Sequence, residues 1–135
     1  MAEELQRPDV VGWIRNVDRQ AWSLELPYEE GGAVRPMFPD LVVARKQGGS
    51  FTFDILEPHD PSRSDNVPKA IGLAQFADRH GYLFGHIELI RKDQSAGQQR
   101  YVRLDCNDPA VRREVLRAST HSQLDALFSR MARTR

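Results

Sequence analysis

The order of apolar and polar positions predicts a short helix followed by strands in the first third of the chain. From Pro8 to about Asp18, apolar residues recur every three or four positions, which predicts a helix. From Ala21 to Pro27 apolar and polar residues alternate, and this period of two predicts a strand with one buried face. Glu29–Gly32 has the composition of a hairpin loop, and Val34–Phe38 is expected to return as the second strand.

The middle of the chain predicts a second hairpin followed by a helix. Leu41–Arg45 is apolar on both faces, which indicates a central strand, and Phe51–Leu56 is its expected partner across a turn at Lys46–Gly49. A helix is predicted from about Val67 to His80, because a stripe of small apolar residues recurs at helical spacing there. The residues of this stripe are Ala70, Leu73, Ala74 and Ala77.

The last third of the chain predicts two strands and two helices. Tyr82–Ile90 and Arg100–Asp105 have the patterns of strands, and Asp108 is expected to cap a helix that ends near Ala118. Thr120 followed three residues later by Gln123 predicts a capping box at the start of a last helix. The resulting order predicts an α+β (α/β) fold, with a mixed central sheet flanked by helices.

Composition limits the possible classes of protein. A chain of 135 residues is expected to form a single domain over residues 1–135. The formal net charge is zero, which argues against a simple electrostatic nucleic-acid binder but not against a nuclease, because clustered carboxylates offset a basic rim. From Arg112 onward there are six arginines and two acids. A single cysteine, Cys106, excludes an intramolecular disulfide, and the absence of a signal peptide or long apolar run predicts a cytoplasmic protein without membrane spans.

Five residues in and after the second hairpin could carry phosphodiester chemistry. They are Asp40, Asp54, Glu57, His59 and Lys69. Hydrolysis of a phosphodiester at neutral pH is commonly assisted by a divalent metal ion, which polarises the phosphate and activates water. Mg²⁺ prefers oxygen ligands and retains several waters, so two carboxylates are often sufficient. A nearby cationic group then orients water or stabilises the developing charge.

The hairpin register determines which acids can cooperate. If the turn is symmetric about Gln47 and Gly48, Asp40 lies opposite Ile55 and shares a sheet face with Glu57. Asp54 then points to the other face, and a single bulge would reverse this assignment. We therefore expect Asp40 and Glu57 to be metal ligands, with Asp54 as the competing second acid.

Pro39-Asp40, an acid on the next strand and a lysine-bearing helix together resemble the PD-(D/E)xK nuclease superfamily. The run from Phe53 to Ser62, followed by Asp65-Asn66 and Lys69-Ala70, more narrowly resembles the C-terminal nuclease-like domain of Type III restriction subunits and related DEAD-box helicase-type proteins. The resemblance covers about residues 8 to 105. It implies a restriction-endonuclease-like fold, Mg²⁺ or Mn²⁺ as cofactor, DNA as substrate and a helicase or ATPase as partner.

The sequence departs from the superfamily pattern at one position. The superfamily places a catalytic lysine two residues after the second acid, whereas here Leu56 follows Asp54 and His59 follows Glu57. His59 or Lys69 could act as the cationic group instead. Two functions remain open: a divalent-metal-dependent DNA endonuclease-like domain, or a catalytically silent module of the same fold that binds DNA or docks onto a helicase partner.

Overall fold

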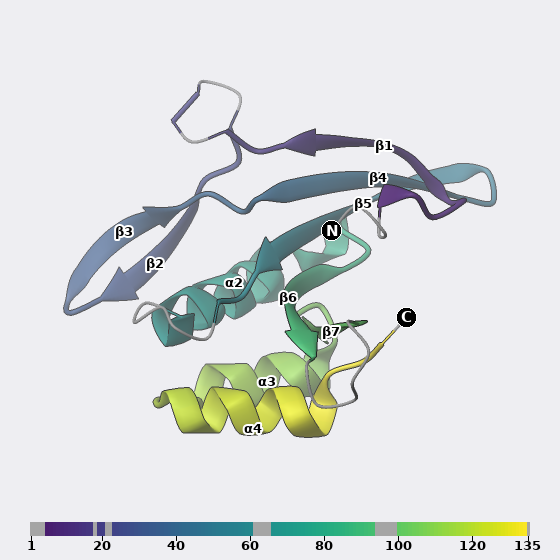
Figure 1. Cartoon of the computed structure of the whole chain (residues 1–135). Coiled ribbons are helices and arrows are strands. Elements are labelled where there is room, and N and C mark those ends of the chain that lie inside the picture. The colour runs from purple at the N-terminus through teal and green to yellow at the C-terminus, as the bar shows by residue number, and fades with distance from the viewer. Residues whose placement is uncertain (1–4, 18, 21–22, 61–65, 94–99, 135) are drawn as a thin grey trace.

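The computed structural model describes residues 5–17, 19–20, 23–60, 66–93 and 100–134, which form a mixed sheet with helices on one side (Figure 1). The larger sheet has five strands in the order β1 (Val10–Arg15), β4 (Leu41–Gln47), β5 (Ser50–Pro58), β6 (Ile87–Asp93) and β7 (Arg100–Asp105). A separate hairpin consists of β2 (Leu26–Glu30) and β3 (Ala33–Met37). The helices are α2 (Asn66–His80), the 3₁₀ turn η1 (Gly81–Leu83), α3 (Pro109–Arg117) and α4 (His121–Met131).

The order of these elements confirms the predicted α+β class. β4 and β5 form an antiparallel hairpin, α2 crosses over the sheet, and β6 then pairs parallel to β5. β7 completes the sheet antiparallel to β6. A parallel neighbour requires such a crossover, because a tight turn can join only antiparallel strands. The predicted helix at 67–80 and its position between the hairpin and the next strand are therefore confirmed.

The prediction for the N-terminal segment is wrong, because residues 10–15 form strand β1 instead of a helix. β1 lies antiparallel to β4, with Trp13 opposite Val43 and Ile14 opposite Val42. The segment is rich in β-branched and aromatic residues, which fit a pleated surface, and Gly12 disfavours a helix. The helical spacing of its apolar residues favours a helix, but the hydrogen bonds that the segment forms with β4 stabilise a strand instead.

Two predicted strands begin later than the sequence pattern suggests. In each case an amide side chain hydrogen-bonds to the backbone of the residues that precede the observed strand. Asn16 exchanges two hydrogen bonds of 2.8 Å with the backbone of Leu24, and β2 begins only at Leu26. The Nδ2 group of Asn107 donates to the carbonyls of Gly81, Phe84 and Gly85, so this segment turns, and β6 begins at Ile87. Ala21 and Trp22 of the first predicted strand lie outside the described residues.

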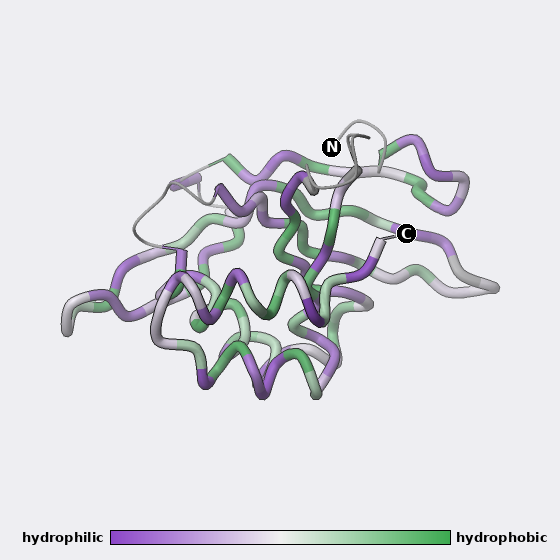
Figure 2. Tube along the Cα trace, turned by 60° about the horizontal axis from the view of Figure 1, so that its bottom comes forward, coloured by the Kyte–Doolittle hydropathy of each residue, from purple (hydrophilic) through white to green (hydrophobic). Residues whose placement is uncertain are grey.

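The helices cover one face of the sheet and bury the main core. α2 buries its predicted stripe against Ile55, Ile87 and Leu104 of the sheet and Leu26 of the β2–β3 hairpin. Apolar and polar positions alternate along the helices in Figure 2, as expected for helices with one buried side. A smaller apolar cluster lies on the opposite face of the sheet, and its buried members are Leu41, Val43, Leu56 and Ile90.

The last two helices start as the sequence predicts. Asp108 accepts a hydrogen bond from the N–H of Ala110 at the start of α3. Thr120 and Gln123 form both hydrogen bonds of the capping box at the start of α4. Among the described residues no helix is both long and apolar enough to cross a membrane.

Candidate functional site

One cavity of about 190 Å³ brings together four of the five residues that the sequence singles out. Asp40, Glu57, His59 and Lys69 all line it. The other lining residues are Pro58, Asp60, Asn66 and Leu89. The cavity lies where β4 begins, β5 ends and α2 begins, and Leu89 of β6 also lines it.

Asp40 and Glu57 are neighbours across the β4–β5 hairpin. The observed register places Leu41 opposite Leu56 and Gln47 opposite Ser50, two residues from the predicted pairing. A shift of two residues leaves every side chain on the same face, so the predicted partnership of Asp40 and Glu57 survives it. Glu57 Oε2 accepts a hydrogen bond of 3.0 Å from the backbone N–H of Asp40, which holds this carboxylate at the start of β4.

Lys69 reaches the cavity from the first turn of α2. It is half-buried, and its Nζ atom lies 6.0 Å from the ring centroid of Tyr28 on the β2–β3 hairpin. At the start of α2, Asn66 is buried and its Nδ2 group donates to the backbone carbonyl of Asp60. This contact ties the beginning of the helix to the chain leaving β5, so that both ends of the connection border the cavity.

His59 forms a buried wall of the cavity. Its ring packs against Phe128 of α4, with centroids 4.9 Å apart, and only 6% of the residue is exposed. Burial lowers the pKa of His59 to about 4, and the positive charge of Arg91 lowers it further in the same direction. The imidazole is therefore neutral near pH 7. Of the two cationic candidates that the sequence offers, His59 does not supply positive charge under these conditions.

The structure does not bring Asp54 to this cavity. Asp54 is fully buried and points to the opposite face of the sheet, where its Oδ2 atom lies 2.5 Å from Nε of Arg45. Its Oδ1 atom accepts a hydrogen bond of 2.8 Å from the backbone N–H of His86. Strict alternation along β5 separates Asp54 from Glu57, as the predicted faces required. Asp54 is placed as one half of a buried ion pair and not as a ligand beside Asp40.

The donor chemistry of the cavity fits a divalent metal ion. Asp40 and Glu57 offer carboxylate oxygens, which are the ligands that Mg²⁺ and Mn²⁺ prefer. Within the described ranges, no group of three or more His, Cys, Asp or Glu side chains is placed to hold a metal ion. An ion held by Asp40 and Glu57 would therefore complete its coordination with water, as Mg²⁺ commonly does.

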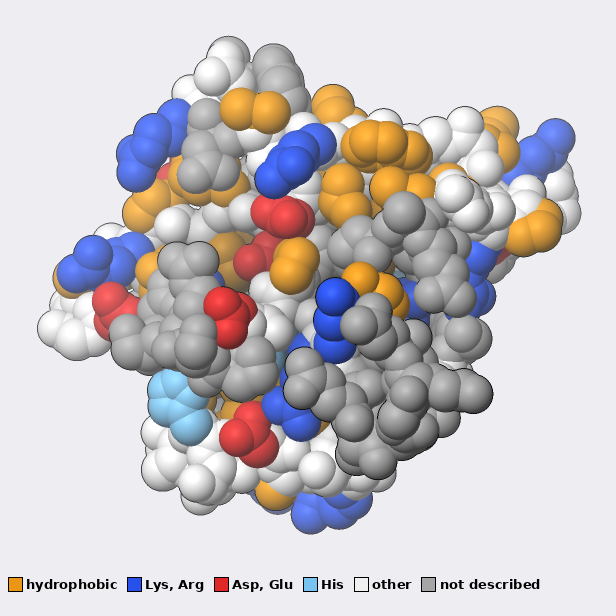
Figure 3. Space-filling view, viewed as in Figure 1, with side chains coloured by type: hydrophobic (Ala, Val, Ile, Leu, Met, Phe, Trp, Pro, Cys, Tyr) orange, Lys and Arg blue, Asp and Glu red, His pale blue; other side chains and the backbone are white. Residues whose placement is uncertain are grey.

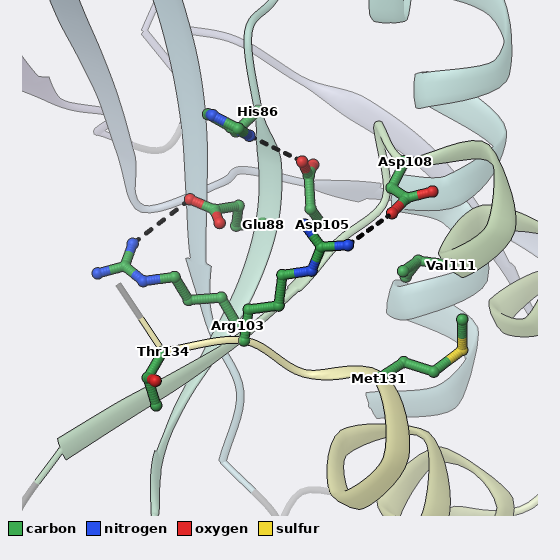
Figure 4. A pocket seen from close by; sticks show the side chains of 9 residues that line it. His86, Glu88, Arg103, Asp105, Asp108, Val111, Met131 and Thr134 are labelled. Carbon is green, nitrogen blue, oxygen red and sulfur yellow. Dashed lines mark hydrogen bonds and ion pairs between the residues drawn. The ribbon is translucent and has the colours of Figure 1, made fainter.

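A second polar cavity, of about 240 Å³, lies beside β6 and β7 and is also lined by Val111 of α3 and Met131 of α4 (Figure 4). His86 Nδ1 lies 2.7 Å from Asp105 Oδ2, and Arg103 Nη1 lies 3.4 Å from Glu88 Oε1. Burial raises the pKa of Asp105, but hydrogen bonds from His86 and two backbone N–H groups outweigh this effect and lower the pKa. Glu88 and Arg103 are almost fully buried. The shared strand face of His86 and Glu88 was visible in the sequence, whereas their partners on β7 were not.

The arginines near the C-terminus mostly face acids in the structure. Arg112 Nε lies 3.8 Å from Asp78 of α2, while Arg117 and Arg130 both approach Glu114 at 3.8 Å. These distances are long and the side chains are partly exposed, so each pair contributes little to stability. The pairing does, however, reduce the positive field that α3 and α4 present to solvent.

Comparison with known proteins identifies the family of the chain. Protein YagJ of Escherichia coli (strain K12) is 30% identical over 88 residues, which is 64% of this chain and 36% of that protein. The chain thus matches little more than a third of the length of this relative. No solved structure matches. Neither comparison tests the resemblance to PD-(D/E)xK nucleases, which stays a prediction. The model of the YagJ family matches residues 1–135, and the chain therefore belongs to the YagJ family.

Proposed function

We propose that the cavity lined by Asp40, Glu57 and Lys69 is the active site of a divalent-metal-dependent DNA endonuclease domain in a restriction or DNA-processing system. The observation that carries this proposal is that three separate elements bring two carboxylates and one lysine to the same small cavity. Titratable groups that converge in a cavity are candidates for a functional site.

The topology supports the same function. A restriction-endonuclease-like arrangement is what the resemblance implies, and it requires a hairpin, a crossover helix and a following parallel strand. β4, β5, α2 and β6 have this order and these directions. Asp40 lies at the start of β4 and Glu57 lies near the end of β5. Because these strands are antiparallel, both acids lie at the same end of the hairpin.

Asp40 and Glu57 would hold Mg²⁺ or Mn²⁺ in this site. Such an ion, when bound, supplies activation of water and neutralises charge on a phosphate. Lys69 would place its ammonium group beside the phosphate and stabilise the negative charge that develops during hydrolysis. The neutral ring of His59 excludes water from one wall and supports the end of β5 that carries Glu57.

A catalytically silent module is the second candidate, and one observation favours it. The position two residues after Glu57 holds a buried, neutral histidine, where the superfamily has a charged lysine. In that case Asp40 and Glu57 would be remnants of a site, and the domain would bind DNA or dock onto a helicase or ATPase. Cleavage and metal binding separate the two candidates experimentally.

The test measures nicking of supercoiled plasmid DNA and thermal stability, each with and without Mg²⁺ or Mn²⁺. We expect the wild type to nick DNA and to gain stability from the ion, by about 2.7 kcal/mol at one hundred times the Kd. Asp40→Asn and Glu57→Gln, which preserve side-chain volume, should abolish both effects. Lys69→Met should abolish cleavage but keep the metal-dependent stabilisation.

The matched control is Asp78→Asn, an exposed acid on α2 whose side chain is 69% accessible and lies outside the cavity. This variant should behave as the wild type. Metal-dependent stabilisation without cleavage would favour the silent module. If the metal ions change neither stability nor DNA, the proposed metal site is refuted and the nuclease proposal fails with it.

A further inference from the structure

The edge strand β1 exposes apolar side chains on both faces of the sheet. Val11, Trp13 and Ile14 are 53%, 54% and 48% exposed. Figure 3 shows hydrophobic side chains gathered along the top of the molecule, over β1 and β4. An exposed apolar edge strand is a template for pairing with another strand, and proteins that stay monomeric usually protect such edges with charges, proline or a covering segment.

The two edges of the sheet differ in this respect. The outer edge of β7 is bridged by the segment after α4, where Arg103 and Arg133 exchange backbone hydrogen bonds of 3.0 and 2.9 Å. Among the described residues, β1 is paired only on its inner side, with β4. The C-terminal segment thus covers the edge at β7, whereas no described segment pairs with the outer edge of β1.

The backbone of β1 is oriented for a further ladder. The N–H of Asn16 donates to the carbonyl of Asp40 at 2.8 Å, so Asn16 bonds inward, toward β4. Bonded residues alternate along an antiparallel ladder, so Ile14 also bonds inward. The backbone groups of Trp13 and Arg15 consequently face outward. The irregular register between Val10 and Gly12 lies before this stretch and does not interrupt it.

A row of apolar side chains runs across the sheet and ends at this edge. Ile87 is paired with Ile55, Ile55 with Val42, and Val42 with Ile14. The first two members are completely buried under the helices, whereas Ile14 is about half exposed at the open end of the row. In the described part of the chain, no further strand residue pairs with Ile14 on its outer side.

We propose that β1 pairs antiparallel with β1 of a second copy of this chain, centred on Ile14. In this register Ile14 lies opposite Ile14 of the second copy, and the apolar row continues through both molecules. On the other face Trp13 lies opposite Arg15 of the second copy, where indole and guanidinium attract each other, and symmetry forms this contact twice. The outward N–H and C=O groups of Trp13 and Arg15 bond to each other across the interface.

Self-complementarity is the reason to choose a second copy as the partner. The same short strand provides both members of each contact, as a two-fold interface requires. The chain has a formal net charge of zero, so two copies do not repel each other over long range. The pairing involves no residue of the proposed metal site and stands independently of the proposed function.

The experiment is sedimentation equilibrium of the purified chain between about 1 and 200 µM, a range that detects micromolar association. The wild type should reach the mass of a dimer. Ile14→Lys places two like charges opposite each other and should weaken dimerisation at least about tenfold. Arg15→Pro removes an outward N–H without removing a bond to β4, and it should also yield a monomer.

Phe51→Lys is the control, because Phe51 is 61% exposed at the far end of β5 and does not belong to the β1 edge. It should leave the dimer intact. Circular dichroism establishes that each variant is folded. Hydrogen exchange of the wild type provides a test without substitution: the amides of Trp13 and Arg15 should become protected as concentration rises. A wild type that stays monomeric, a dimer unaffected by both β1 variants, or exchange at these amides that is independent of concentration would refute the proposal.

Discussion

Replacing Asp54 by alanine should destabilise the protein strongly although Asp54 lies outside the proposed active site. Asp54 is 0% exposed and its ion-pair partner Arg45 is 1% exposed, so the substitution leaves a guanidinium in the interior without its closest acid. The cost arises mainly from this remaining charge, because it has been removed from water and loses its closest acid.

The structure indicates the size of the effect. Breaking a buried ion pair by removing one partner costs about 3–5 kcal/mol. Asp9 also approaches Arg45, at 3.3 Å and with a partly exposed side chain, so we expect the lower end, about 3 kcal/mol. Asp54→Asn retains an acceptor for the N–H of His86, at 2.8 Å in the wild type, and should cost about half as much. Either loss is large beside a total stability of about 5–15 kcal/mol.

Urea unfolding followed by circular dichroism measures these differences. Asp40→Asn is the comparison, since Asp40 is half-buried at the edge of a cavity, and it should change stability by less than about 1 kcal/mol. Arg45→Met combined with Asp54→Leu removes both charges and should recover much of the loss. An Asp54→Ala variant as stable as Asp40→Asn would refute the assignment of Asp54 to a buried structural pair.

Three further measurements follow from particular side chains. The pKa of His59 is lowered from 6.5 to about 4 in the folded state, so the unfolded chain takes up a proton first. The free energy of unfolding should therefore fall by up to about 3 kcal/mol as pH decreases from about 6.5 to about 4. Urea titrations at several pH values measure this fall, and His59→Leu should remove it. Gly72→Ala should lower the free energy of unfolding by about 1–3 kcal/mol, because the new Cβ would lie 2.6 Å from Cβ of Tyr28. Gly49→Ala is the control: a Cβ there would have no atom within 4 Å, and the loss should be less than about 0.5 kcal/mol. Thermal melts of the two variants measure the difference. Burial raises the pKa of Cys106, so its thiol should react with a thiol reagent only after the chain unfolds.

The parts of the fold that the sequence predicts correctly are those whose signals are local. The capping box of α4 needs only Thr120 and Gln123, and the stripe of α2 lies within one helix. The failures occur where a distant residue decides. Whether residues 10–15 form a helix or a strand depends on the available edge of β4, and the late start of β6 depends on the side chain of Asn107.

The candidate site is predicted in part for the same reason. The faces of Asp40, Glu57 and Asp54 follow from alternation, which is insensitive to a register error of two residues. The character of His59 could not be predicted in this way. Its neutral, buried state depends on Phe128, which belongs to the last helix and reaches the end of β5 only in the folded structure.

The insertion of the β2–β3 hairpin between β1 and β4 has a consequence for local unfolding. β1 joins the sheet only after the chain has closed a long loop, whereas β4 and β5 are joined by a tight turn. Detaching β1 gives up the contact between Asp9 and Arg45 but leaves the shorter bond between Arg45 and Asp54 intact. In the monomer, the amides of β1 should therefore exchange with deuterium through a partial opening, at a lower free energy than those of β5, whose exchange requires global unfolding. The sheet would then persist transiently with four strands, and the backbone of β4 would become its edge.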